Sequence, residues 1–162
     1  MEKEVKKHLY KASIIIFALD IISVILSYFW IHSDFFALPM CFVTLISVGI
    51  FLIDYLSDTK ADLWNIFYVG SSATIIIITF ICIVYTFVNF YISLAILYHG
   101  DAVIVDGIYY LSSRGNILNP ISQSEYYKLV LAERRIFSAF LLPLSAIPFA
   151  YWSSRYKRNN FS

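Results

Sequence analysis

The sequence predicts an all-α polytopic membrane protein: four transmembrane helices, with a small three-stranded β meander and an amphipathic helix inserted before the last span. Of the 162 residues, 60% are hydrophobic and 14% are charged, whereas soluble domains average about 45–50% apolar and about 25% charged residues. The apolar residues gather into runs of about 20, the length that a helix needs to cross a bilayer. One more polar stretch, 99–135, carries a pattern of short strands and turns, which predicts an extramembrane module.

The first span is predicted at about 12–31 and the second at about 35–56. Lysines precede the first span as in a signal peptide, but its apolar run is about 20 residues long and no small-x-small cleavage site follows, so we expect a retained helix. Pro39 falls in the first turn of the second span, where its missing N–H does least harm. The lysines before the first span are Lys3, Lys6, Lys7 and Lys11.

The third span is predicted at 63–98, so residues 1–98 hold the first three spans. A helix of this length would be roughly 54 Å long, against a hydrocarbon core of about 30 Å. It must therefore be strongly tilted, or its second half must project from the membrane. The polar and aromatic residues Asn89, Tyr91 and Tyr98 favour projection.

The fourth span is predicted at about 136–152, within a last segment, 136–162, that ends in a basic tail. Pro143 and Pro148 predict a kink or local unwinding there. Basic residues lie before the first span and after the fourth, and an even number of spans puts both termini on the same side. The positive-inside rule therefore places both termini in the cytoplasm and the loop 99–135 outside.

Residues 102–121 predict the meander. Asp106-Gly107 lies between two β-prone runs, and this pair favours a type I′ hairpin turn, which needs positive φ at both central residues. Arg114-Gly115-Asn116 predicts a second turn, followed by a short third strand at Ile117-Leu118. Asn119-Pro120 ends that strand, because proline cannot donate to a ladder. So short a sheet is barely stable alone, so it must lean on a neighbouring helix or subunit.

A helix is predicted to begin after the meander. Ser122 and Glu125 have the spacing of a capping box. Tyr126, Glu133 and Phe137 share one helical face, a pattern that allows this helix to continue into the fourth span.

Three short stretches carry a resemblance: Gly107-Ile-Tyr-Tyr-Leu-Ser-Ser-Arg-Gly115, Ile121-Ser122-x-x-Glu125-Tyr126 and Arg135-x-Phe137-Ser138. They resemble a pattern in small bacterial four-span inner-membrane proteins of unassigned function, with Arg114 in place of a turn histidine and Ala139-Phe140 in place of Gly-His. The architecture is also similar to membrane subunits of phage-defence systems of the Kiwa type and to immunity proteins against pore-forming toxins. The resemblance implies a multi-pass protein of the bacterial inner (plasma) membrane. The folded loop itself predicts a partner or sensing module comprising Asp106, Gly107, Tyr109, Arg114, Gly115, Glu125, Tyr126 and Arg135.

The residue pattern argues against an enzyme. No Ser/His/Asp order, glycine-rich phosphate loop or His-Glu-x-x-His motif occurs, and His8, His32 and His99 are scattered. We therefore expect no catalytic residue, no cofactor and no metal site. The net charge of +1 gives no reason to expect direct binding to nucleic acid.

Asp20 is the outstanding polar residue, because a carboxylate near the middle of a span costs on the order of 2.5–3.5 kcal/mol to insert. It is interpreted either as an assembly or packing lock, satisfied by hydroxyls on neighbouring helices, or as an ion- or proton-handling group. Gly70, Ser71 and Thr74 form a small-residue stretch that would let another helix approach closely, within one subunit or between subunits.

These features favour a non-catalytic integral membrane subunit of a bacterial defence or immunity system. Such a subunit would form a homo-oligomer in the bilayer and sense or recruit a protein partner, either a soluble effector or a toxin. The alternative is an ion channel or transporter component that uses Asp20.

Overall fold

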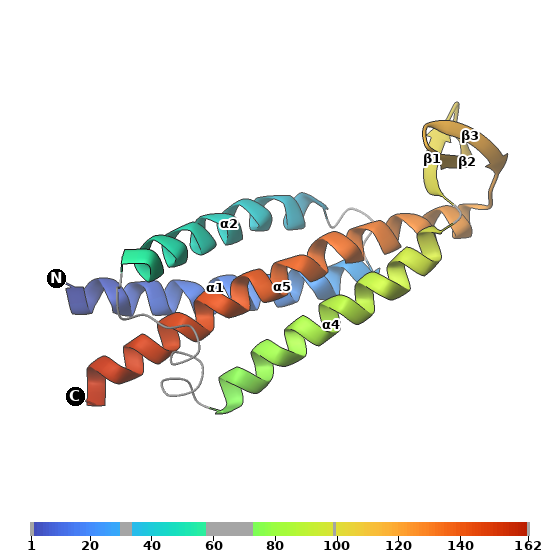
Figure 1. The fold of residues 1–162 in the computed structure, drawn as a ribbon. Coiled ribbons are helices and arrows are strands. Elements are labelled where there is room, and N and C mark those ends of the chain that lie inside the picture. The colour runs from blue at the N-terminus through green and yellow to red at the C-terminus, as the bar shows by residue number, and fades with distance from the viewer. Residues whose placement is uncertain (1, 30–33, 58–72, 99, 162) are drawn as a thin grey trace.

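The computed structural model describes residues 2–29, 34–57, 73–98 and 100–161 (Figure 1). Four helices in these ranges are long and apolar enough to cross a membrane. Together with the three-stranded sheet before the last helix, they confirm the helical fold class in its broad outline. The elements are α1 (Glu2–Phe29), α2 (Asp34–Ser57), α4 (Ala73–Leu97), β1 (Asp101–Val105), β2 (Ile108–Ser113), β3 (Asn116–Pro120) and α5 (Gln123–Phe161).

The last helix, α5, is the centre of the bundle. It packs against α1, α4 and α2, and α1 and α2 each pack more extensively on α5 than on each other. In its most apolar stretch, 61% of residues are buried, against 17% in that of α2. The neighbouring helices approach α5 closely because small residues recur every seven positions on it, and small side chains let helix backbones come together. These residues, all at most 1% exposed, are Ala132, Ala139, Ala146 and Ser153.

The helices bury polar side chains and expose apolar ones. The buried residues of α4 recur at intervals of four and three, and most are polar or small: Ile75, Thr79, Cys82, Thr86, Asn89 and Ser93. The opposite side of α4 exposes large apolar residues such as Phe80 and Phe87. The inner side of α1 is also polar, with Ser13, Asp20, Ser23 and Ser27 buried. This distribution is the reverse of that in a water-soluble bundle.

The predicted unwinding of the fourth span is wrong. α5 is one continuous helix of 39 residues that contains both Pro143 and Pro148. A proline inside a helix leaves the carbonyl four residues earlier without its donor, and for Pro143 that carbonyl belongs to Ala139. The hydroxyl of Thr86 on α4 lies 2.9 Å from the Ala139 carbonyl oxygen and 2.9 Å from the Cys82 carbonyl oxygen of its own helix, so its one proton is shared between these two acceptors. The neighbouring helix thus satisfies the group that Pro143 leaves without a partner.

The structure changes the expectation about which helix exceeds the bilayer thickness. The described third helix begins at Ala73, and residues 63–72 of the predicted span lie outside the described part of the chain. Its 25 residues correspond to about 37 Å. The 39 residues of α5 correspond to about 58 Å, so the longest element is the combined amphipathic helix and fourth span.

The three predicted strands are confirmed as an antiparallel sheet in the order β1-β2-β3. Asp106 and Gly107 have φ angles of 52° and 80°, and Arg114 and Gly115 have 52° and 82°. Both pairs therefore have the positive φ angles that type I′ turns require. The third strand is longer than predicted, because it covers Asn116–Pro120.

The sheet is attached to the end of the bundle that lies far from both termini (Figure 1). The ring of Tyr109 lies 4.8 Å from that of Tyr126 on α5, and the Ile121 N–H donates to the Tyr109 carbonyl at 2.9 Å. Gly100 connects α4 to β1 with a φ of 131°, and a Cβ there would overlap the Ser112 carbonyl oxygen. The sheet thus leans on α5, one of the supports expected from the sequence.

Candidate functional site

Asp20 lies at a junction of three helices. Its side chain is 0% exposed, and the Thr44 hydroxyl on α2 donates to its two carboxyl oxygens at 2.9 and 3.2 Å. Ser145 on α5 lies beside the same carboxyl group. A buried carboxyl group needs such partners because removal from water is costly. The partners belong to the same chain, so this arrangement can hold α1 against α2 and α5 without a second subunit.

A second polar cluster lies nearer the sheet, where α1, α4 and α5 meet. The Tyr28 and Tyr85 hydroxyls are 2.9 Å apart, and Tyr28 also donates to the Asn89 side-chain oxygen at 3.3 Å. The Asn89 amide donates to the Arg135 carbonyl at 2.9 Å. The Arg135 guanidinium lies 5.1 Å from the centre of the Tyr28 ring, in cation–π range. Arg135 therefore helps to join three helices.

A third cluster lies at the end of the bundle that holds both termini. The Arg155 guanidinium and the Tyr151 hydroxyl both donate to Asp54 Oδ2, each at 2.5 Å, and Arg155 lies 5.2 Å from the centre of the Tyr151 ring. Sequence analysis overlooked Asp54 and its pairing with Arg155. The available signal was a carboxylate near the end of an apolar run, opposite the basic end of the last span.

The predicted small-residue stretch is described only at Thr74. Gly70 and Ser71 lie outside the described residues, and Thr74 is exposed in the first turn of α4. Close packing among the described helices uses the buried alanines and serines of α5. Their seven-residue spacing is visible in the sequence, but it is interleaved with charges and prolines that obscure it.

The residues predicted to form the partner or sensing module do not come together at one point. Asp106, Gly107, Arg114 and Gly115 are exposed at the two hairpin turns, and Arg135 belongs to the Tyr28 cluster instead. The structure brings together only Tyr109 and Tyr126 as a contacting pair.

The predicted capping box is confirmed at the start of α5. The Ser122 N–H donates to Glu125 Oε2 at 2.9 Å, and the Glu125 N–H donates to the Ser122 hydroxyl oxygen at 3.2 Å. In this first turn, donation from the Ser122 backbone and then from its hydroxyl lowers the pKa of Glu125. Glu125 is therefore engaged in capping the helix.

The sheet presents apolar side chains on the face opposite Tyr109. The strand register places Val105, Ile108 and Ile117 on that face, with Val105 opposite Ile108 at one end of the sheet and Ile117 opposite Ser112 toward the other. They are 37%, 50% and 52% exposed. β3 is exposed along its whole length, and no extensive contact with α5 covers it. The sheet therefore offers an apolar face and an accessible edge strand.

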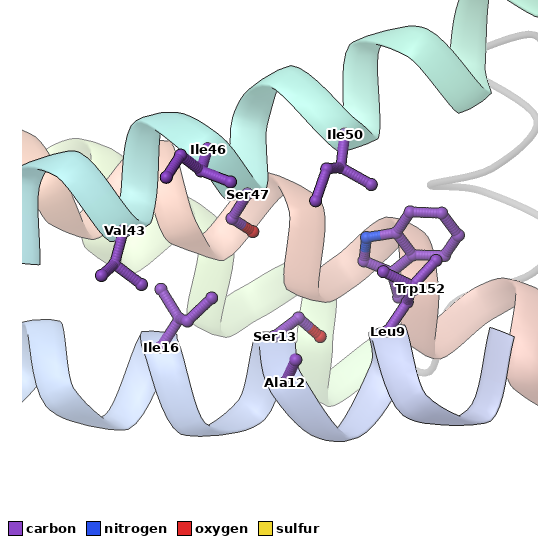
Figure 2. A pocket seen from close by; sticks show the side chains of 9 residues that line it. All are labelled: Leu9, Ala12, Ser13, Ile16, Val43, Ile46, Ser47, Ile50 and Trp152. Carbon is purple, nitrogen blue, oxygen red and sulfur yellow. The ribbon is translucent and has the colours of Figure 1, made fainter. Parts of the chain in front are cut away.

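Two apolar cavities lie against the helices. One, of about 140 Å³, runs between α1 and α2 and is floored by Trp152 of α5 (Figure 2). The other, of about 280 Å³, lies between α4 and α5 beside Phe87, Phe140 and Pro143. Asp20 lines neither cavity. Within the described ranges, no group of three or more His, Cys, Asp or Glu side chains could hold a metal ion.

Comparison of the chain with protein-family models, curated protein sequences and solved structures gives no match. The resemblance to small inner-membrane proteins stays an expectation. The fold itself defines a class of helical proteins with four helices of membrane-spanning length and apolar character, joined by buried polar contacts.

Proposed function

We propose that this chain is a non-catalytic integral membrane subunit that crosses the bilayer with α1, α2, α4 and α5 and presents its sheet to a protein partner. The observation that carries the proposal is the apolar sheet face at the end of the bundle, formed by Val105, Ile108 and Ile117. Large apolar side chains exposed on one face of a small sheet suit it to contact with a partner.

Membrane integration is supported by the outward-facing side chains of the helices. Phe42 and Ile53 on α2 and Phe80 and Phe87 on α4 are each between 65% and 70% exposed, as expected of lipid-facing residues. In water these surfaces would favour aggregation, whereas in a bilayer they contact lipid tails at no cost. The buried hydroxyls and carboxyl then supply polar contacts between helices.

The edge strand β3 is the part of the sheet best suited to a protein partner. An edge strand carries backbone N–H and C=O groups that another strand can pair with. β3 is exposed along its length. Its apolar side chains Ile117 and Leu118 are 52% and 48% exposed and are available for contact with a partner. A partner segment could add to this edge as a further strand and cover the apolar face.

Site-directed photocrosslinking in the membranes of the native host tests this proposal. A photoreactive residue at Ile117 should give one reproducible protein adduct, and the same residue at Lys128, on the adjoining helix, should not. Adding Leu118→Asp should abolish the Ile117 adduct while the protein remains in the membrane. If Ile117 and Lys128 give the same adducts, or neither gives any, the sheet is not the partner surface.

Phage defence, toxin immunity, homo-oligomerisation and the cytoplasmic position of both termini stay hypotheses alongside this proposal. A single cysteine at Asn116, in a chain lacking Cys41 and Cys82, should react with an impermeant maleimide in intact cells if the sheet lies outside. Reaction only after lysis would place the sheet in the cytoplasm and make a soluble effector the expected partner.

The alternative, an ion channel or transporter component, requires Asp20 to lie on an ion path. Full burial and the hydrogen bonds from Thr44 favour a packing role instead. Flux into liposomes decides between them: equal background flux for the wild type and Asp20→Asn excludes the channel, and flux that Asp20→Asn abolishes establishes it.

A further inference from the structure

The groove between α1 and α2 has the form of a lateral binding site. Ser13 and Ile16 of α1 form one wall, Ser47 and Ile50 of α2 form the other, and Trp152 of α5 forms the floor (Figure 2). Its volume of about 140 Å³ accommodates about five groups of the size of a water molecule or methylene. That is enough for a segment of a hydrocarbon chain and too little for a second helix.

The groove exists because α1 and α2 meet each other less closely than they meet α5. Small residues, Ala12, Ser13 and Ser47, line the gap and leave space that larger side chains would fill. On the outer side, Ile46 and Ile50 are 63% and 41% exposed. The groove therefore opens sideways, toward the lipid tails of a bilayer.

Two polar groups inside the groove distinguish it from a purely apolar gap. Figure 2 shows the indole nitrogen of Trp152 on the side of the ring that faces the groove, and the Ser47 hydroxyl on the facing wall. Within the described part of the chain, neither group has a hydrogen-bond partner. Both can donate, so they fit a ligand that carries acceptor oxygens next to a hydrocarbon chain.

The charge near the Leu9 end of the groove narrows the class of ligand further. Leu9 lies in a stretch of the sequence, residues 1–11, that contains four lysines and two glutamates. Tyr156 of α5 stacks on Tyr10 of α1, with ring centres 4.8 Å apart, and Lys157 and Arg158 follow it in the sequence. Clusters of basic residues at a membrane surface attract anionic headgroups.

We propose that this groove binds one acyl chain of an anionic glycerophospholipid from the leaflet next to the two termini. The Trp152 indole N–H and the Ser47 hydroxyl donate to an ester oxygen, and the basic ends of α1 and α5 lie near the headgroup. The proposal rests on the membrane integration proposed above. It goes further by naming a ligand class and a site separate from the sheet.

Fluorescence quenching by brominated lipids tests the site with the full chain. In a Trp30→Phe, Trp64→Phe background only Trp152 fluoresces. The protein is reconstituted into phosphatidylcholine vesicles that contain, at equal mole fraction, either phosphatidylglycerol or phosphatidylcholine with dibrominated acyl chains. Brominated phosphatidylglycerol should quench Trp152 more strongly, with about a fivefold preference for each basic side chain that reaches the headgroup.

A matched pair of variants separates the groove from general lipid contact. Ala12→Leu combined with Ser47→Leu fills the groove and should remove the preference for phosphatidylglycerol. Ala18→Leu adds the same side chain at an exposed position of α1 outside the groove and should leave the preference unchanged.

Several outcomes would overturn the proposal. Equal quenching by both lipids rejects the anionic ligand, and quenching that survives in the filled variant rejects the groove. No quenching in protein that floats with the vesicles means that the groove is closed or covered by a second copy of the chain. Protein that fails to float with the vesicles instead refutes membrane integration, and with it both proposals.

Discussion

The hydrogen bond from Thr86 to the Ala139 carbonyl offers a sharp test of how α4 supports α5. In Thr86→Val the side chain keeps its shape but loses the donor, so the carbonyl that Pro143 deprives of its helical partner becomes buried and unsatisfied. Thr86 is 5% exposed and its hydroxyl lies 2.9 Å from the Ala139 oxygen. An unsatisfied buried acceptor costs about 1–3 kcal/mol, whereas hydrogen bonds between membrane helices average about 0.6 and reach about 1.7 kcal/mol.

We therefore expect Thr86→Val to lower the free energy of unfolding by about 1–1.5 kcal/mol. Pro143→Ala supplies a backbone N–H that can bond the Ala139 carbonyl, so Thr86→Val in that background should cost less than about 0.5 kcal/mol. Thr79→Val is the control, because Thr79 is also 5% exposed but donates only to Ile75 of its own helix. That variant should change stability by less than about 0.5 kcal/mol in either background.

The assay is reversible unfolding in mixed detergent micelles at increasing mole fraction of sodium dodecyl sulfate, followed by circular dichroism. The quantity of interest is the coupling energy of the double-mutant cycle between positions 86 and 143. A coupling energy within about 0.3 kcal/mol of zero would refute the reasoning. So would a loss at Thr79 as large as that at Thr86.

Three further predictions address other elements. Gly100→Ala should open the sheet to proteolysis, because a Cβ would overlap the Ser112 carbonyl oxygen. Gly49→Ala is the control: its Cβ meets no atom within 4 Å, so it should stabilise α2 by about 0.5–1 kcal/mol. Equal protease sensitivity of the two variants would contradict this prediction. Asp20→Ala should raise the rate of amide exchange in α1 and α2 more than Asp20→Asn, which keeps an acceptor for the Thr44 hydroxyl; identical rates would contradict a packing role. Arg155→Ala should lower the melting temperature in detergent by less in an Asp54→Asn background, and equal losses would show that the ion pair contributes nothing measurable.

The buried polar contacts between the helices have one physical explanation. Hydrocarbon offers little driving force for apolar helices to associate, so packing of small residues and hydrogen bonds hold membrane helices together. The Asp20 junction and the Asn89 amide show both features, because the carboxyl lies beside a small serine, Ser145, and the amide reaches the α5 backbone.

Local features were predictable from the sequence with good accuracy. Asp106-Gly107 predicted a type I′ hairpin turn, because few residue pairs accept positive φ twice in succession, and Arg114-Gly115-Asn116 predicted a second turn. The spacing of Ser122 and Glu125 predicted the helix start, because each side chain can accept a hydrogen bond from the backbone N–H of the other residue. The helices themselves followed from apolar runs of membrane-spanning length.

Features that depend on distant residues could not be predicted in this way. Pro143 indicated a kink or local unwinding, because the sequence alone does not show that Thr86 lies opposite the Ala139 carbonyl. Asp20 indicated an assembly or packing role first and an ion-handling role second, and its burial against Thr44 supports packing. The seam of alanines and serines on α5 was not predicted.

The sequence by itself determined what each segment can form: four apolar helices, one type I′ turn and a second turn, a capped helix start and a polar carboxyl in an apolar run. Those properties depend on residues within a few positions of one another. Only the tertiary structure decided that α5 is the central helix, that Asp54 pairs with Arg155 across 101 positions, and that α1 and α2 leave a groove above Trp152. These depend on which helix faces meet, because a side chain's partners in space are chosen by packing over the whole bundle.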